Sequence, residues 1–230
     1  EAILARKHPR GPICVLPTAS AEPVDSAHSY VKDFERYGGD GAAVAVNLTT
    51  SNPEKARDPR FAGQLEQCGG YFFTGGDQSR IVDVLRPGGE DTPAAAALRR
   101  AHAEGAVISG SSAGAAMMSD PMVGAGSSRD ALRHGVTDRE SGDGVWVRPG
   151  MGFLDEGLTG QHFLARGRLG RHLVALAAHP GERIGIGVDE DTAAVLDGRM
   201  LTVLGRSQVV VTLADAKVDQ AADLAGRLWL

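Results

Sequence analysis

The chain has 230 residues, of which 42% are hydrophobic, and one domain spanning residues 1–230 is enough to bury a core of that size. Its 24 basic and 29 acidic residues give a formal charge of −5 with no basic block, which argues against a nucleic-acid-binding surface. No apolar stretch approaches the length of a membrane span and no signal peptide is visible, so we expect a cytoplasmic protein with no membrane partner.

In the first half of the chain, short apolar runs alternate with helix-like segments. Each run precedes a turn marked by Gly or Pro, and this alternation predicts a parallel β-sheet covered by helices on both faces. Sites in such sheets form beyond the carboxyl ends of the strands, so the turns at 17–20, 74–78 and 110–114 are expected to open on one edge. The apolar runs are Ile13 to Leu16, Ala42 to Val46, Tyr71 to Phe73 and Ala106 to Ile108.

The chain contains two cysteines. Cys14 lies inside the first apolar run, and Cys68 precedes a Gly-Gly pair. We interpret both as free thiols in a reducing compartment.

The segment Gly110-Ser111-Ser112-Ala113-Gly114 joins the fourth apolar run to a helix-like stretch. A strand that turns sharply into a helix around Gly-x-Ser-x-Gly is typical of a nucleophile elbow, in which small residues leave the central serine exposed. Here the central residue is Ser112, at a helix N-terminus whose N–H groups would favour an oxyanion. A plain Gly/Ser-rich turn explains the pattern equally well unless partners for the serine exist.

The second half of the chain begins with a polar segment, residues 124–150, which we interpret as a long loop or partly ordered lid. A helix-like stretch follows around residues 172–178. The remaining strand-like runs, separated by turns, predict an antiparallel extension of the sheet. These runs are Ile184 to Val188, Ala193 to Leu196, Met200 to Leu204 and Val209 to Val211.

A serine nucleophile needs a base and usually a third group that orients the base. His162, which follows a glycine-marked turn, stands apart from the histidines in helix-like segments, although a structural role suits it as well. Glu190 lies in the acidic run after the 184–188 strand, where an ordinary surface turn is the alternative. Gly76 could supply an oxyanion N–H and Gln78 a polar substrate contact, or the glycines there only make a turn. No His or Cys spacing indicates a metal ligand.

Taken together, these segments resemble peptidase family S51, and within it the cyanophycinases more than the aspartyl dipeptidases. The resemblance implies a fold similar to class I glutamine amidotransferases, in three layers with a mostly parallel sheet flanked by helices, and usually a homodimer. The matching blocks are residues 15–20, 72–80, 109–116, 161–171 and 185–193.

The resemblance also implies roles for individual residues. It makes Ser112 the nucleophile, His162 the base and Glu190 the acid that orients the base. No metal or organic cofactor is implied. The expected activity is hydrolysis of aspartyl-linked peptide bonds. The expected substrate is cyanophycin, a polymer of aspartate that carries arginine on its side chains, and the expected product is β-aspartyl-arginine. The implied oxyanion-hole residues are Gly76 and Ala113, and the implied substrate contacts are Gln78, Gln161, Arg168 and Arg171.

Two departures from the family pattern keep alternatives open. Gly160 stands where cyanophycinases typically carry Asp before the Gln-His pair. The change removes a carboxylate suited to binding a substrate cation. The alternative substrate is therefore an aspartyl or isoaspartyl dipeptide, or a specialised peptide. Family members also usually begin with another strand, so we expect an N-terminal piece ahead of Glu1 to be missing. A non-catalytic peptide-binding homologue and a general α/β-hydrolase remain as rivals, although the latter orders its triad Ser, acid, His.

Overall fold

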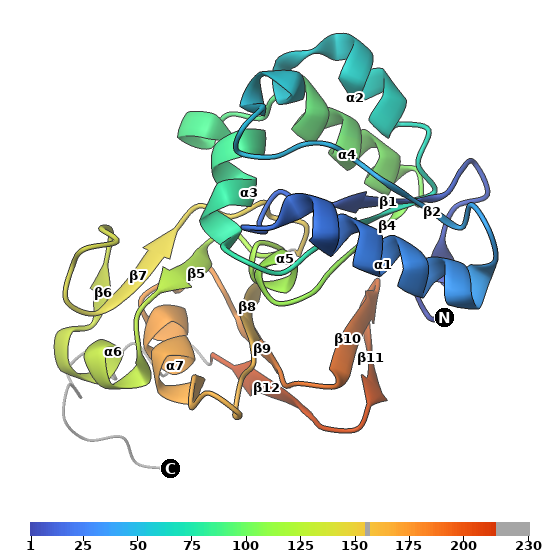
Figure 1. Cartoon of the computed structure of the whole chain (residues 1–230). Helices are drawn as coiled ribbons and strands as arrows, with labels where there is room; N and C mark the ends of the chain where they lie inside the picture. The colour runs from blue at the N-terminus through green and yellow to red at the C-terminus, as the bar shows by residue number, and fades with distance from the viewer. Residues whose placement is uncertain (155–156, 215–230) are drawn as a thin grey trace. The chain divides into compact units, whose positions relative to one another are not determined.

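The computed structural model describes residues 1–154 and 157–214 (Figure 1). The chain divides into two units, Glu1–Met117 and Met118–Leu230, each held mainly by contacts within itself. The interpretation of residues 1–230 as one domain stays a prediction. Among the described residues, no helix combines the length and the apolar character that crossing a membrane requires.

The sheet of the first unit consists of four parallel strands in the order β2-β1-β3-β4. Its strands alternate with helices along the chain, which confirms the α/β class and the parallel sheet expected from the apolar runs. The carboxyl ends of all four strands therefore share one edge. The strands are β1 (Ile13–Leu16), β2 (Ala43–Ala45), β3 (Gly70–Phe73) and β4 (Val107–Gly110).

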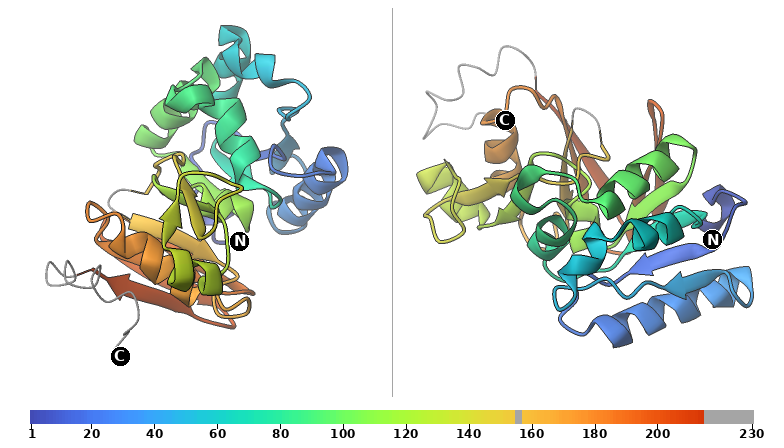
Figure 2. Two further views of the ribbon diagram at one scale, coloured as in Figure 1. Left: turned by 90° about the vertical axis from the view of Figure 1, so that its left-hand side faces the viewer. Right: turned by 90° about the horizontal axis from the view of Figure 1, so that it is seen from above.

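Helices cover both faces of this sheet, as Figure 2 shows from above. On one face, Phe34 of α1 packs against Phe72 of β3 with ring centroids 5.4 Å apart. On the other face, the Tyr71 hydroxyl donates to the Leu65 carbonyl of α2 over 2.6 Å. Neighbouring residues of one strand thus contact opposite layers, as the alternation of a β-strand requires. The helices are η1 (Leu4–Arg6), α1 (Pro23–Gly38), η2 (Pro53–Arg57), α2 (Pro59–Leu65), α3 (Gln78–Leu85), η3 (Pro87–Gly89), α4 (Pro93–Ala103) and α5 (Ala113–Ala116).

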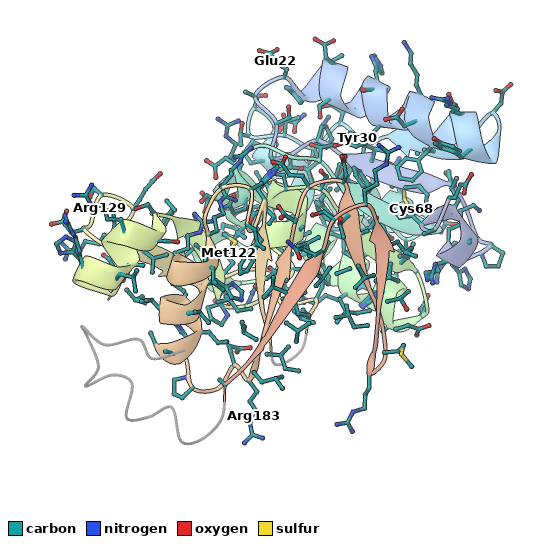
Figure 3. The ribbon with its side chains drawn as sticks, turned by 90° about the horizontal axis from the view of Figure 1, so that it is seen from below. Glu22, Tyr30, Cys68, Met122, Arg129 and Arg183 are labelled. Atoms are coloured by element: carbon teal, nitrogen blue, oxygen red, sulfur yellow. A yellow bond between two sulfur atoms is a disulfide. The ribbon has the colours of Figure 1, made fainter. Side chains whose placement is uncertain are left out.

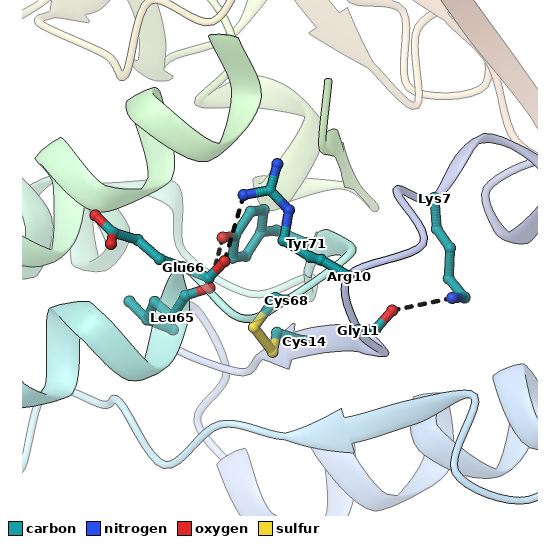
Figure 4. The surroundings of a disulfide bond; sticks show 8 residues. All are labelled: Lys7, Arg10, Gly11, Cys14, Leu65, Glu66, Cys68 and Tyr71. Atoms are coloured by element: carbon teal, nitrogen blue, oxygen red, sulfur yellow. Dashed lines mark hydrogen bonds between the residues drawn. A yellow bond between two sulfur atoms is a disulfide. The ribbon is translucent and has the colours of Figure 1, made fainter. Parts of the chain in front are cut away.

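The prediction of free thiols is wrong, because Cys14 and Cys68 form a disulfide (Figure 4). Cys14 lies in β1 opposite Tyr71 of β3, and Cys68 lies just ahead of β3, so parallel pairing of the two strands brings the sulfurs together. The Cα atoms are 5.8 Å apart, a usual separation for a disulfide, and both side chains are buried. The free-thiol argument therefore no longer supports a reducing compartment, and the cytoplasmic location stays a prediction without it.

The second unit contains a three-stranded sheet in the order β12-β9-β8. The β8 and β9 strands pair in parallel and the β12 strand pairs antiparallel to β9, while β10 and β11 form a separate antiparallel hairpin. These pairings confirm the antiparallel extension. The elements are β8 (Gly157–Gln161), α7 (Leu169–Ala177), β9 (Ile184–Val188), β10 (Thr192–Asp197), β11 (Met200–Gly205) and β12 (Val209–Leu213).

Helix and strand occupy much of the segment 124–150, which corrects its interpretation as one long loop, while a role as a lid stays a prediction. Its helix α6 starts at a capping box in which Ser127 and Asp130 each bond the other's backbone. Apolar side chains then pack this segment against α7, with Val145 and Ala131 buried beside Ala175. Figure 3 shows the opposite, polar side of α6, where Arg129 points away from the ribbon. The elements are β5 (Met122–Ala125), α6 (Ser128–His134), β6 (Val136–Thr137) and β7 (Val145–Arg148).

Loss of the disulfide is expected to destabilise the first unit. The bridge joins cysteines 54 residues apart, and closing a loop of that length contributes about 4 kcal/mol to the free energy of unfolding in the chain-entropy model. Denaturant unfolding of the oxidised protein, the reduced protein and the Cys14→Ala/Cys68→Ala variant measures this contribution, and the last two should agree. Labelling of both cysteines by a maleimide in denaturant without reductant would contradict the bridge.

Candidate active site

Ser112 lies in the sharp turn between β4, which ends at Gly110, and α5, which begins at Ala113. Its backbone has φ 52° and ψ −107°, a conformation that a non-glycine residue adopts only when its surroundings enforce it. The flanking glycines allow the turn, because a Cβ at Gly110 would meet the Gly114 backbone and a Cβ at Gly114 would meet Phe73. The strand-turn-helix context expected of a nucleophile elbow is therefore present.

The turn after β3 lies beside this serine. A Cβ placed on Gly75 would be 3.3 Å from the Ser112 Cβ and 3.9 Å from its Oγ. Gly76 has φ 136° and approaches the Ala19 carbonyl so closely that a side chain there would collide with it. The turn then leads into α3, where Asp77 accepts a hydrogen bond from the Ser79 N–H over 2.8 Å.

Two backbone N–H groups of the first unit suit an oxyanion. In the part of the chain that the structure describes, neither the Gly76 N–H nor the Ala113 N–H donates a hydrogen bond. Because α5 spans four residues, its dipole is small, and these individual donors matter more than the helix itself. Gln78, the first residue of α3, is buried, with 8% of its surface exposed.

In the second unit, His162 and Glu190 form a hydrogen-bonded pair. The two residues follow the neighbouring parallel strands β8 and β9, whose carboxyl ends lie at the same edge. The imidazole Nδ1 is 2.9 Å from Glu190 Oε1. A carboxylate on Nδ1 fixes the imidazole tautomer so that Nε2 becomes the basic nitrogen. The bond joins the two side chains that the resemblance names as base and orienting acid, and their catalytic roles stay a prediction.

The loops that carry this pair are held by further contacts. His162 has φ 48°, another left-handed backbone for a residue with a side chain. Asp189 Oδ1 accepts a hydrogen bond from the Ala165 N–H over 3.2 Å and from the Glu190 N–H over 3.1 Å, and so joins the loop after β8 to the loop after β9. Sequence reasoning counted Asp189 only within an acidic run, and its position directly after a strand was the one available signal.

Other histidines of the described chain make contacts typical of structural residues. His102 bonds the Ala106 carbonyl at 2.9 Å through Nδ1, and His179 bonds the Ala175 carbonyl at 2.7 Å. His172 is 2% exposed in α7, and neither of its ring nitrogens has a hydrogen-bond partner among the described residues. No group of three or more His, Cys, Asp or Glu residues in those ranges is arranged to hold a metal ion.

The residues expected to contact substrate in the second unit lie near one another along β8 and α7. Arg168 Nη1 donates to the Gln161 carbonyl over 2.9 Å, and Arg171 Nη1 donates to the Gly126 carbonyl over 2.8 Å. Burial, with smaller contributions from Arg168 and Arg166, lowers the pKa of Arg171 to about 10, and burial and then Arg166 lower the pKa of Arg168. Neither Arg168 nor Arg171 enters an ion pair within residues 1–154 and 157–214.

The amino-acid sequence has relatives among characterised proteins. It is 36% identical over 202 residues to a cyanophycinase from Trichormus variabilis, an alignment that covers 86% of this chain and 62% of the relative. It is 34% identical over 201 residues to a cyanophycinase from Geminocystis herdmanii, with 86% of this chain and 68% of the relative covered. The chain thus spans somewhat less than two thirds of the first relative's length.

The fold is similar to that of a crystallised peptidase from an acI-B1 Actinobacterium, with a TM-score of 0.67 at 20% identity over 90% of this chain and 81% of the other. At that identity the likeness concerns the fold alone. The model of peptidase family S51 matches residues 3–204. Because that match spans most of the sequence and the cyanophycinases align over 86% of it, this chain belongs to peptidase family S51.

Proposed function

We propose that this protein is a serine peptidase that hydrolyses aspartyl-linked peptide bonds, with cyanophycin as its substrate. The observation that carries the proposal is the His162–Glu190 hydrogen bond of 2.9 Å, because a carboxylate on Nδ1 is what a catalytic imidazole needs. Ser112, at an elbow with φ 52°, supports it as the nucleophile.

The proposed reaction runs through an acyl-enzyme. Ser112 Oγ attacks the carbonyl carbon of the scissile amide, and its proton passes to Nε2 of His162. The C–N bond then breaks as the proton moves from His162 to the departing amine, which leaves the acyl group on Ser112. A water then attacks the ester carbonyl carbon while it gives a proton to Nε2 of His162. The bond from that carbon to Ser112 Oγ breaks, the acid product leaves, and His162 returns the proton to Oγ. Glu190 stabilises the imidazolium formed in each half of the reaction.

Gly76 and Ala113 are proposed to bind the oxyanion of the tetrahedral intermediates. Their N–H groups are not engaged elsewhere in the described residues, so no existing hydrogen bond would have to break. A donor of this kind contributes roughly 3 kcal/mol of transition-state stabilisation in a serine hydrolase. Gln78 would contact the substrate from the same turn.

The substrate proposal rests on two observations. The relatives at 34–36% identity are cyanophycinases. Arg168 and Arg171 are partly or fully desolvated without a carboxylate partner among the described residues, and guanidinium groups bind carboxylates with paired hydrogen bonds. We propose that these arginines, with Gln161, bind the free carboxylates of the polymer or of its arginine units. A homodimer and a cytoplasmic location are further proposals.

The direction in which a side chain at residue 160 would point bears on the choice between the alternative substrates. A Cβ on Gly160 would lie 2.9 Å from the Phe163 ring and 3.2 Å from His172 Nδ1, so a side chain there starts inside the packed second unit. The absence of Asp at this position is therefore weak support for a change of substrate. An aspartyl or isoaspartyl dipeptide remains the alternative to be measured.

Ser112→Ala is expected to lower turnover of cyanophycin by about a thousandfold or more, since the nucleophile is lost. Ser111→Ala is the matched control, because it removes the neighbouring hydroxyl. A fluorophosphonate probe should label the native protein and Ser111→Ala but not Ser112→Ala. Undiminished hydrolysis by folded Ser112→Ala would refute the proposal.

The native protein measured on cyanophycin and on a panel of α- and β-aspartyl dipeptides separates the substrate alternatives. Release of β-aspartyl-arginine from the polymer supports cyanophycin. Turnover of the dipeptides without hydrolysis of cyanophycin supports the dipeptide as the substrate. Absence of both turnover and phosphonate labelling supports the non-catalytic peptide-binding homologue.

Glu190→Gln should lower kcat by about a hundredfold or more while KM stays close to its native value. The amide keeps the size of the side chain but no longer stabilises the imidazolium. Asp197→Asn, at the exposed turn of the β10–β11 hairpin, is the matched change of charge and should leave kcat unchanged. Equal kcat values for the two variants would remove Glu190 from the mechanism.

Gly75→Ala should slow acylation of Ser112 by about tenfold, because the new methyl group crowds the serine at 3.3 Å and a shift well below 1 Å is enough to disturb attack. Gly63→Ala, in α2, is the matched control, since a Cβ there meets nothing within 4 Å. Burst kinetics or the rate of phosphonate labelling measures the effect. Equal rates in the two variants would show that the turn beside Ser112 tolerates a side chain.

A further inference from the structure

The buried imidazole of His172 has no evident reason to be a histidine. It is 2% exposed on α7, and neither Nδ1 nor Nε2 has a hydrogen-bond partner within the described residues. Buried polar groups are nearly always bonded, and leaving one without a partner is destabilising. The contacts of the His172 ring must therefore explain why this side chain lies at a buried position.

The imidazole lies against Phe163, the residue that follows His162. The two rings meet edge to face, with centroids 5.0 Å apart and planes at 88°. This is a favourable geometry for aromatic rings, and Phe163 is fully buried. His172 therefore holds the side chain next to the proposed base.

Glycines of two neighbouring strands leave room for both rings. Gly160 of β8 lies opposite Gly187 of β9, and a Cβ at either position would press on the Phe163 ring. A Cβ at Gly185 would collide with His172 Nε2.

The strands β8, β9 and β12 contain no titratable side chain over their described residues, and burial and then Arg171 lower the pKa of His172 to about 4. The imidazole is therefore neutral near pH 7.

Phe163 in turn restrains the backbone of His162. Its N–H donates to the Val188 carbonyl of β9 over 3.3 Å, and its carbonyl accepts from the Arg168 N–H over 2.8 Å. Both bonds hold the Phe163 backbone, which directly follows His162 with its φ of 48°. A shift of Phe163 would therefore move the backbone from which the His162 imidazole reaches Glu190.

We propose that His172 is a positioning residue, whose side-chain bulk holds Phe163 on the glycines of β8 and β9 and thereby holds His162 at Glu190. Its role as a residue of an active site rests on the proposed function. The contact itself is a feature of the second unit and can be tested without any substrate.

The test compares His172→Ala, which removes the side chain that contacts Phe163, with His172→Met, which keeps a similar volume and replaces the ring contact with a thioether. Gly160→Ala disturbs the same contact from β8 and keeps the proposal testable if His172→Ala does not fold. The matched controls are His179→Ala, on the same helix but bonded to its own backbone, and Gly181→Ala, where a Cβ meets nothing within 4 Å.

Two readouts are needed. The first is the ¹⁵N and downfield ¹H spectrum of the His162 imidazole, which reports its Nδ1 hydrogen bond whether or not the protein is an enzyme. The second is the rate of phosphonate labelling of Ser112. We expect His172→Ala and Gly160→Ala to lose the His162 signal and to be labelled about tenfold more slowly or worse, with His172→Met and both controls within about threefold of native.

Two results would overturn the inference. If His172→Ala lowers Tm but leaves the His162 spectrum and the labelling rate unchanged, His172 is only a core residue. If His172→Met is as impaired as His172→Ala, filling the volume beside Phe163 is not enough and the role assigned to bulk is wrong. If the native protein is not labelled at all, the proposed function fails, while the spectrum still decides the role of His172.

Discussion

The left-handed backbones of Ser112 and His162 are the constraint on which the proposed chemistry depends. Each residue has a positive φ that its neighbours must enforce, and closely packed glycines lie two residues from each of them. Around Ser112, Gly110 and Gly114 let the turn fold against β3. Around His162, Gly160 lets an aromatic ring lie directly on the strand. A side chain at any of these glycines would press on the backbone or ring packed against it.

The strands and the elbow could be predicted from sequence because their signals are local. Apolar runs before glycine turns lie close to the observed strands, and the motif Gly-x-Ser-x-Gly by itself predicts a sharp turn between a strand and a helix. The His162–Glu190 pair was harder to predict from the sequence, because no residue near either one identifies its partner. The resemblance to a known family selected the two residues, and the parallel register of β8 and β9 explains why residues 28 positions apart meet.

The errors came from properties that only tertiary structure determines. Cys14 and Cys68 meet because β1 pairs with β3 rather than with a more distant strand, and two isolated cysteines give no sign of that order. The segment 124–150 has a polar composition, so its few buried residues, such as Val145, did not stand out as a repeating pattern. The bonds of Arg168 and Arg171 to backbone carbonyls could not be predicted either, because no sequence pattern marks them, while the substrate contacts of these arginines stay a prediction.

The Cys14–Cys68 bridge also affects how cleavage of the first unit would be observed. The cysteines flank a stretch that contains exposed residues of α1, and a protease cutting there would leave both fragments covalently joined. A nicked molecule would therefore keep the mobility of the intact chain on a gel run without reductant. The same sample would separate into two bands once thiol is added, so an assessment of integrity for this protein depends on the electrophoresis conditions.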